Sequence, residues 1–137
     1  MKTSILTTII LLLTLISCNK DVEVNSILFS TWEAKSFMSI ESVAYPKNEN
    51  NKIQLAFYEN GIYSLKLDVN GCGGTFKMNN ENQIEIEPAN CTYICCDSKF
   101  SDKLAMTISK VTSYSIEGKI LKLNVPQWGY IKLELVE

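Results

Sequence analysis

The sequence predicts a mainly β fold with a minor α component: a small antiparallel β-barrel or sandwich of about seven to eight strands with one helix. Apolar and polar residues alternate along most of the chain after residue 26, which is typical of strands that bury one face and leave the other in water. Turn residues interrupt these runs about every 8–12 residues, a spacing typical of small all-β domains. One segment instead has apolar residues at helical spacing.

The first half of the chain supplies most of the candidate strands. The alternating runs are residues 27–40, 52–58, 62–69, 74–78 and 83–87. Asn60 with Gly61, and Asn70 with Gly71, separate the second, third and fourth runs. The Asn-Gly pair favours a tight hairpin turn because both residue types tolerate positive φ. We therefore expect a hairpin turn at each pair and a solvated loop over residues 43–51.

The helix is predicted over residues 98–111. The apolar residues of its expected buried face, spaced four apart, are Phe100, Leu104 and Ile108. Ser98 or Ser101 is placed to cap its N-terminus, because a serine oxygen can accept from a free backbone N–H there. After the helix, we expect a hairpin over residues 114–125 and a last strand over residues 130–136.

The N-terminal segment has the pattern of a bacterial lipoprotein signal. Lys2 supplies a positive charge, and residues 5–16 form an apolar run. A transmembrane helix needs about 20 apolar residues, whereas the apolar region of a secretory signal has about 7–15. The run is followed by Ser17 and Cys18. This order resembles a lipobox, in which a small residue precedes a cysteine that is lipidated and becomes the new N-terminus.

We therefore expect three regions: a signal peptide over residues 1–17, a polar tether over residues 18–26 that starts at lipidated Cys18, and a β-domain over residues 27–137. The lipobox resemblance implies palmitate-type acylation of Cys18, and more than one acyl chain gives stable membrane anchoring. The expected location is the bacterial cell envelope, lipid-anchored at the outer membrane, on its periplasmic or surface face. An ordinary signal peptide with an incidental Cys18 is the alternative.

The composition excludes several kinds of function. All 13 basic residues are lysines, so the chain has neither arginine nor histidine. Without histidine, Ser-His-Asp and Cys-His catalysis and histidine-ligated metal sites are impossible. A net charge of −2 provides no basic surface for nucleic acid. We expect no enzyme activity, no metal, no cofactor and no nucleic-acid partner.

Four cysteines remain if Cys18 carries lipid. They are Cys72, Cys91, Cys95 and Cys96. An even number of cysteines in an exported chain predicts disulfides. Neighbouring Cα atoms are about 3.8 Å apart, below the usual disulfide range of ~4.4–6.8 Å, which disfavours a Cys95–Cys96 bond. Two arrangements remain: Cys72–Cys96 with Cys91–Cys95, or Cys72–Cys95 with Cys91–Cys96.

A four-cysteine zinc site and a redox-active dithiol are the alternatives to structural disulfides. Zinc sites favour two pairs of closely spaced cysteines, whereas Cys72 stands alone. Dithiol redox sites favour a Cys-x-x-Cys motif, which the sequence lacks. We therefore favour structural disulfides.

Three glycines surround Cys72. They are Gly71, Gly73 and Gly74. Glycine tolerates positive φ, so we expect them to form a tight turn. A glycine-rich phosphate loop is the alternative, but neither a Lys-Ser/Thr pair nor the start of a helix follows.

The centre of the chain resembles the central signature of the META-domain (HslJ-like) family of small bacterial envelope proteins. The residues that carry the resemblance are Asn70, Cys72, Gly74 and Phe76, after a lead-in at Gly61, Ile62 and Tyr63. Thr92 with Cys95 and Cys96 resembles the second signature of the family, and Trp32 fits its first strand. A closing run also agrees with the family pattern, at Val111, Tyr114, Ile116, Gly118, Leu121 and Leu123.

The resemblance covers about residues 27–136 and implies a compact β-rich fold with one helix. It implies no established catalysis and carries over no active site. In the family pattern Cys91 has no counterpart, so the resemblance favours Cys72–Cys96 over Cys91–Cys95 as a bridge.

The leading functional hypothesis is a non-catalytic, membrane-anchored envelope lipoprotein with a structural, stress-related or protein-interaction role and an unknown envelope protein as partner. The alternative is a small-ligand binder of lipocalin type, which requires an apolar cavity of about 300 Å³ at the mouth of the barrel. Trp32 and Trp128 could stack on such a ligand, although buried packing is favoured. An enzyme would instead require convergent carboxylates with shifted pKa values in one cleft.

Overall fold

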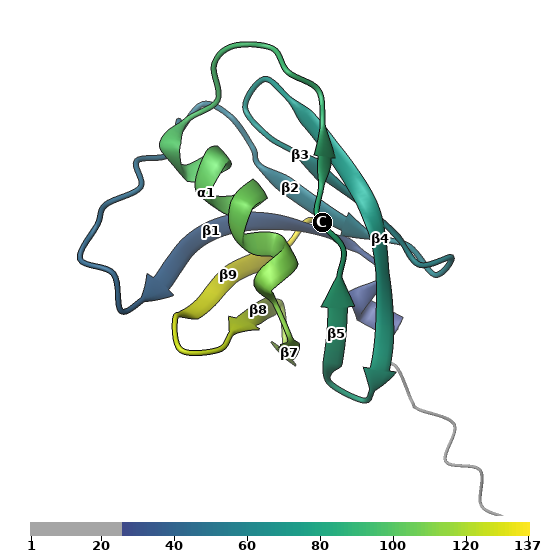
Figure 1. Cartoon of the computed structure of the whole chain (residues 1–137). Coiled ribbons are helices and arrows are strands. Elements are labelled where there is room, and N and C mark those ends of the chain that lie inside the picture. The colour runs from purple at the N-terminus through teal and green to yellow at the C-terminus, as the bar shows by residue number, and fades with distance from the viewer. Residues whose placement is uncertain (1–25) are drawn as a thin grey trace, which may run out of the picture.

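The computed structural model describes residues 26–137 (Figure 1). The predicted signal peptide, Cys18 and the tether up to residue 25 lie outside the described residues. The described part of the chain forms one nine-stranded antiparallel sheet with a single α-helix. The predicted mainly β fold class is confirmed.

The strands and helices agree closely with the predicted runs. The strands are β1 (Thr31–Ser39), β2 (Gln54–Phe57), β3 (Ile62–Lys66), β4 (Gly71–Asn80), β5 (Gln83–Ile86), β6 (Asn90–Cys91), β7 (Ser113–Glu117), β8 (Ile120–Val125) and β9 (Gly129–Leu135). The helices are α1 (Lys99–Thr107) and two 3-10 helices, η1 (Ser26–Leu28) and η2 (Ile108–Lys110). Within residues 26–137, no helix is long and apolar enough to cross a membrane. The addition to the prediction is β6, which at two residues is too short to show alternation.

The sheet closes into a ring. Its strands follow the order β3-β2-β1-β9-β8-β7-β5-β4, and β3 also pairs with β4. The β5–β7 contact is the narrowest in the ring, with one paired position, Gln83 opposite Ser113. The short strand β6 pairs with the first part of β4 and places Cys91 opposite Cys72.

The inside of the ring is filled by side chains. The largest fully buried ones include Trp32, Phe57, Tyr63, Leu55, Leu121 and Leu123. Trp32 donates from Nε1 to the carbonyl oxygen of Leu28 at 3.1 Å, and Tyr63 donates from its hydroxyl to the carbonyl oxygen of Glu87 at 2.8 Å. Burial raises the pKa of Tyr63 to about 12. The tyrosine hydroxyl therefore stays protonated and remains a donor.

Helix α1 packs on β1 with the face that the sequence predicts. The predicted apolar residues are buried: Phe100 and Leu104 in α1, and Ile108 at the start of η2. The ring of Phe100 stacks on that of Phe37 from β1, with centroids 4.4 Å apart. Of the two predicted caps, the structure uses Ser98, whose Oγ accepts from the backbone N of Ser101 at 3.2 Å.

The tight turn predicted around Cys72 is wrong. Gly71, Gly73 and Gly74 lie inside strand β4, and all three have negative or extended φ values. Gly74 is required for a different reason, because Tyr63 on the neighbouring strand packs directly over it. A Cβ atom at Gly74 would lie 2.8 Å from Cε1 of Tyr63.

Candidate functional site: the cysteine loop

Residues 92–98, between β6 and α1, form the candidate site, which we call the cysteine loop because it contains Cys95 and Cys96. In Figure 1 this segment leads into α1 at the top of the view. Two residues of the family signatures meet here, Asn70 and Thr92, although 22 positions separate them. The cysteine loop is thus where the separate motifs of the sequence come together.

Asn70 fixes the cysteine loop through both ends of its side-chain amide. Its Nδ2 donates to the carbonyl oxygen of Ile94 and to Oδ2 of Asp97, each at 2.6 Å. Its Oδ1 accepts from the backbone N of Ile94 and from Oγ1 of Thr92, each at 2.8 Å. Asn70 is 8% exposed and its four bonds are partly buried, so an amide left unpaired there would be costly.

Two aspartates extend this arrangement to the neighbouring elements. Asp97 accepts at Oδ1 from the backbone N of Val69 at 2.8 Å. Asp68 accepts at Oδ2 from Oγ of Ser98 and Oγ of Ser101, each at 2.5 Å. Burial would raise the pKa of Asp68, but the hydrogen bonds from Ser101 and Ser98 outweigh it and lower that pKa below its ordinary value. The ionised carboxylate therefore links the β3–β4 connection to the start of α1. We call Asn70, Asp68, Asp97, Thr92 and Ser98 the Asn70 cluster.

The cysteine pairing differs from both predicted arrangements. The structure bonds Cys72 to Cys91 and Cys95 to Cys96. Strands β4 and β6 place Cys72 directly opposite Cys91, with Cα atoms 4.0 Å apart. Because Cys72 pairs with Cys91, Cys95 and Cys96 bond to each other, contrary to the expectation from their sequence adjacency. The Cys72–Cys96 bridge favoured by the family resemblance is therefore corrected to Cys72–Cys91.

Four exposed apolar side chains lie in the cysteine loop or next to it, and we call them the apolar patch. They are Val69, Tyr93, Ile94 and Met106. Tyr93 is fully exposed, Met106 is 69% exposed and Ile94 is 59% exposed. Tyr93 and Met106 also line a hollow of about 320 Å³, together with Leu67 and Ala105. Exposed apolar side chains gathered on a fixed support are typical of interaction surfaces.

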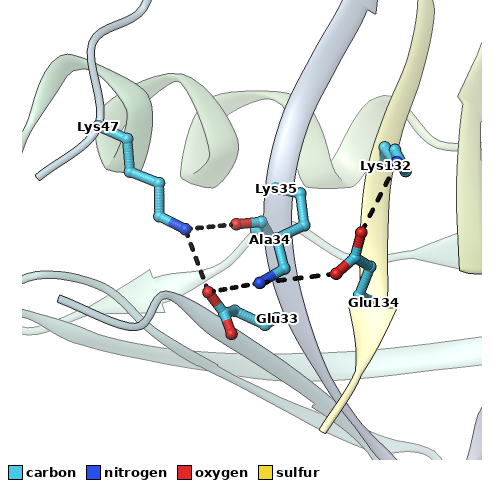
Figure 2. A network of polar contacts seen from close by, with 6 residues as sticks. All are labelled: Glu33, Ala34, Lys35, Lys47, Lys132 and Glu134. Atoms are coloured by element: carbon cyan, nitrogen blue, oxygen red, sulfur yellow. Dashed lines mark hydrogen bonds and ion pairs between the residues drawn. The ribbon is translucent and has the colours of Figure 1, made fainter. Parts of the chain in front are cut away.

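A second polar group lies on β1 and β9 (Figure 2). Lys47 donates to the carbonyl oxygen of Ala34 at 2.8 Å and lies 3.4 Å from Oε1 of Glu33. Figure 2 shows Lys35 between two carboxylates, 2.9 Å from Glu33 and 3.7 Å from Glu134. With Lys132, 3.7 Å from Glu134, the group has three lysines paired with two carboxylates.

A break in strand register explains how Lys35 reaches both carboxylates. The pairing of β1 with β9 shifts between Ala34 and Ser36, and such a bulge re-aims the side chain at the extra residue. The hydrogen bond from Lys35 is the largest influence on Glu33, and it holds the pKa of that carboxyl below its ordinary value. An ion-paired carboxylate of this kind is a poor general base at neutral pH.

The segment after β1 packs against β1 and α1 through a cluster of aromatic and charged side chains. Glu41 contacts Nζ of Lys103 at 2.8 Å and accepts from the hydroxyl of Tyr45 at 2.6 Å. These hydrogen bonds, first that of Lys103 and then that of Tyr45, lower the pKa of Glu41 to about 2. Trp128 is half-buried here, with its ring centroid 5.8 Å from that of Phe37. Trp128 is therefore a packing residue of this cluster.

The structure gives no support to the lipocalin-type alternative. Trp32 and the other core side chains fill the ring. The 320 Å³ hollow is lined by loops and α1, and a second hollow of about 280 Å³ lies between β1 and the segment that follows it. A third, of about 510 Å³, is lined mainly by polar residues.

Within residues 26–137, no group of three or more cysteine or carboxylate side chains is arranged to hold a metal ion.

The family-motif residues serve two structural purposes. Trp32, Tyr63 and Phe76 belong to the core, Gly74 makes room for Tyr63, and Asn70 and Thr92 belong to the Asn70 cluster. Sequence reasoning missed Asp68, which bonds Ser98 across 30 positions. The available signal was Ser98 itself. A capping serine accepts a hydrogen bond from the helix backbone, and its hydroxyl hydrogen is then free to donate to an acceptor such as Asp68.

The fold and this site define a class of small β-ring domain, with one helix and a buried polar cluster that supports an exposed cysteine loop. The model of the META domain family matches residues 25–129. The chain therefore belongs to the META domain family, and the predicted membership of that family is confirmed.

Two solved structures share the fold. A DUF4847 family protein from Bacteroides vulgatus ATCC 8482 has 13% sequence identity and a TM-score of 0.55, over 79% of this chain and 93% of that one. A protein from Burkholderia xenovorans solved by NMR has 10% identity and a TM-score of 0.61, over 79% of this chain and 82% of that one. At these identities the similarity shows the fold alone. No curated protein matches the chain.

Proposed function

We propose that this chain is a lipid-anchored protein of the bacterial cell envelope, and that its META domain has no catalytic role and binds a partner protein through the apolar patch. The observation that carries the binding role is the fully exposed Tyr93, together with Ile94 and Met106, on a loop fixed by Asn70. Exposing these side chains to water is unfavourable unless a partner covers them.

The composition of the apolar patch suits a protein partner. Tyrosine and methionine are enriched in protein interfaces, and charged residues are typical of the rim. Asp97 and Asp102 line the same hollow as Tyr93 and Met106, so an apolar centre lies beside acidic groups. Because the Asn70 cluster already orders the loop, binding there would cost little conformational entropy.

A non-catalytic role is supported by the state of the carboxylates. The pKa values of Glu33 and Glu41 are lowered by bonded lysines, whereas general acid–base catalysis at neutral pH needs a pKa near 7. Both groups act as partners of lysines that fix segments of the chain. Their chemistry is that of structural ion pairs.

The anchoring part of the proposal rests on the sequence. Lys2, the apolar run over residues 5–16 and the order of Ser17 and Cys18 support lipidation at Cys18. Outer-membrane anchoring is tested by expressing the full chain and its Cys18→Ser variant, followed by membrane fractionation and mass spectrometry of the processed N-terminus. We expect the unaltered chain in the membrane fraction with an acylated N-terminal Cys18. The Cys18→Ser variant should carry no acyl group and should not be cleaved before residue 18. An unmodified N-terminus in the unaltered chain would refute the anchor.

The binding part is tested with a photo-crosslinking phenylalanine analogue placed at Tyr93 in intact envelopes. The matched control carries the analogue at Tyr58, another exposed tyrosine, in the connection between β2 and β3. We expect a discrete protein adduct from Tyr93 and none from Tyr58. Adding Met106→Ser should reduce the adduct, because it removes part of the apolar patch. Equal adducts from both tyrosines, or none from either, would contradict the proposal.

A further inference from the structure

The two disulfides join very different parts of the chain. Cys72–Cys91 links β4 to β6 across 19 positions, and Cys72 is 8% exposed. Cys95–Cys96 links sequence neighbours. A disulfide stabilises a fold mainly by restricting the unfolded chain, to an extent that grows with the loop it closes. The Cys95–Cys96 bond closes no loop of chain, so it does not stabilise the fold by restricting the unfolded chain.

The Cys95–Cys96 pair is also accessible. Both cysteines are exposed in the cysteine loop. A thiol that exchanges with a disulfide must approach along the S–S axis, so exposure is a requirement of the reaction. In the other disulfide Cys72 is 8% exposed whereas Cys91 is exposed, so an attacking thiol can approach it only from the Cys91 side.

The position of the cysteine loop does not depend on the Cys95–Cys96 bond. The residue before the pair, Ile94, is bonded to Asn70 through both its backbone N and its carbonyl oxygen. The residue after the pair, Asp97, is bonded to Asn70 and Val69. Opening the disulfide would therefore leave two thiols side by side on a loop whose flanks remain fixed.

From these observations we propose that Cys95–Cys96 is a reversible thiol–disulfide exchange site that accepts two electrons from an external dithiol. The site is distinct from the binding role of the apolar patch and does not require it. A thiolate of the dithiol attacks one sulfur of the pair, forms a mixed disulfide and releases the other cysteine as a thiolate. The second thiol of the reductant then attacks the reductant's other sulfur, which is held in the mixed disulfide. This step releases the second cysteine of the pair as a thiolate. The reductant leaves as a disulfide, and Cys95 and Cys96 take up two protons to become thiols.

The adjacency of the pair selects a dithiol over a monothiol. After attack by a monothiol, the released cysteine lies next to the mixed disulfide and can expel the attacking group, because an intramolecular reaction is strongly favoured. A dithiol completes the second step within the same complex. The chemical class of co-substrate is therefore a protein or small-molecule dithiol.

The test is stepwise reduction of the purified full chain carrying Cys18→Ser, so that every cysteine detected belongs to the domain. The chain is treated with increasing dithiothreitol, alkylated, digested with trypsin and mapped by tandem mass spectrometry. Cleavage after Lys66, Lys77 and Lys99 separates Cys72 from the peptide that holds the other three cysteines. We expect Cys95 and Cys96 to be alkylated at about a tenfold lower dithiothreitol concentration than the one that separates the two peptides. Glutathione at the same thiol concentration should leave the pair mostly oxidised.

The matched controls are two double variants. Cys95→Ser with Cys96→Ser should abolish alkylation at low dithiothreitol while the two peptides stay linked, with an unchanged melting temperature. Cys72→Ala with Cys91→Ala should retain the low-concentration alkylation at Cys95 and Cys96 wherever the variant is folded. Simultaneous opening of both disulfides, or a mapped bridge from Cys72 to Cys95 or Cys96, would overturn the proposal.

Discussion

At the scale of single residues, the side-chain amide of Asn70 holds the β3–β4 connection and the cysteine loop together. Asn70 makes four hydrogen bonds with residues of the cysteine loop while it is almost fully buried. Each bond contributes about 1 kcal/mol net, and a buried partner left unpaired costs more. We expect Asn70→Ala to lower the free energy of unfolding by about 3 kcal/mol, measured by urea denaturation.

Thr92→Val is the matched control for that substitution. It removes the hydroxyl that donates to Asn70 and keeps the size of the side chain, so we expect a loss of about 1 kcal/mol. A smaller loss for Asn70→Ala than for Thr92→Val would show that Asn70 is not the centre of the cluster.

Glu41 gives the fold a pH dependence that can be measured. Hydrogen bonds from Lys103 and Tyr45 lower its pKa from 4.5 to about 2 in the folded chain. A carboxyl whose pKa is lower in the folded state stabilises the fold above its unfolded pKa and loses that effect as the pH falls towards its folded pKa. We expect the stability difference between the unaltered chain and Glu41→Gln to be present at neutral pH and to disappear between pH 4.5 and about 2.

Urea unfolding across this pH range measures the effect. Glu49→Gln is the control, because Glu49 is an exposed glutamate in the same connection between β1 and β2. If Glu41→Gln and Glu49→Gln have the same pH profile, the ion pair of Glu41 with Lys103 does not contribute.

At the scale of elements, strand β4 can be tested with two of its own glycines. A Cβ atom at Gly74 would meet the buried ring of Tyr63 at 2.8 Å, whereas a Cβ atom at Gly71 meets no described atom within 4 Å. Overpacking a core typically costs about 1–3 kcal/mol. We expect Gly74→Ala to destabilise the fold by about 2 kcal/mol and Gly71→Ala to leave stability unchanged, as measured by thermal unfolding. Equal effects at the two positions would contradict close approach as the reason for Gly74.

Elements with local signals were predictable, and elements that depend on a partner were not. The helix follows from Phe100, Leu104 and Ile108, which share one face, and from the cap at Ser98. Strand β6 has two residues and exists because β4 lies beside it. The bulge near Lys35 likewise arises only from pairing with β9. Neither leaves a periodic pattern in its own sequence.

At the scale of the whole molecule, the Cys72–Cys91 disulfide is the covalent link between segments distant in sequence. A loop of this length, 19 positions, corresponds to about 3 kcal/mol of stabilisation by chain entropy. We expect Cys72→Ala with Cys91→Ala to lose about this much in urea denaturation without reductant. Cys95→Ser with Cys96→Ser should lose almost nothing, and a comparable loss in both variants would contradict the entropy argument.

The candidate site was predictable only in its parts. Asn70 and Thr92 were identified from the family signatures, and the four cysteines from their even number in an exported chain. Their arrangement was not, since Asn70 meets its partners across 22 to 27 positions and the cysteine pairing depends on β4 lying opposite β6. Side-chain pairings at such separations are set by the closed ring, which only the three-dimensional structure reveals.

The ring also places the start of β1 next to the end of β9. The backbone N of Val136 donates to the carbonyl oxygen of Thr31 at 2.9 Å, and Trp32 lies opposite Leu135. A short linker could therefore join residue 137 to residue 26, and new ends could be opened at the exposed loop tip near Glu49 and Asn50. Such a circular permutant would keep every strand pairing, because the order of strands around the ring does not depend on where the polypeptide starts.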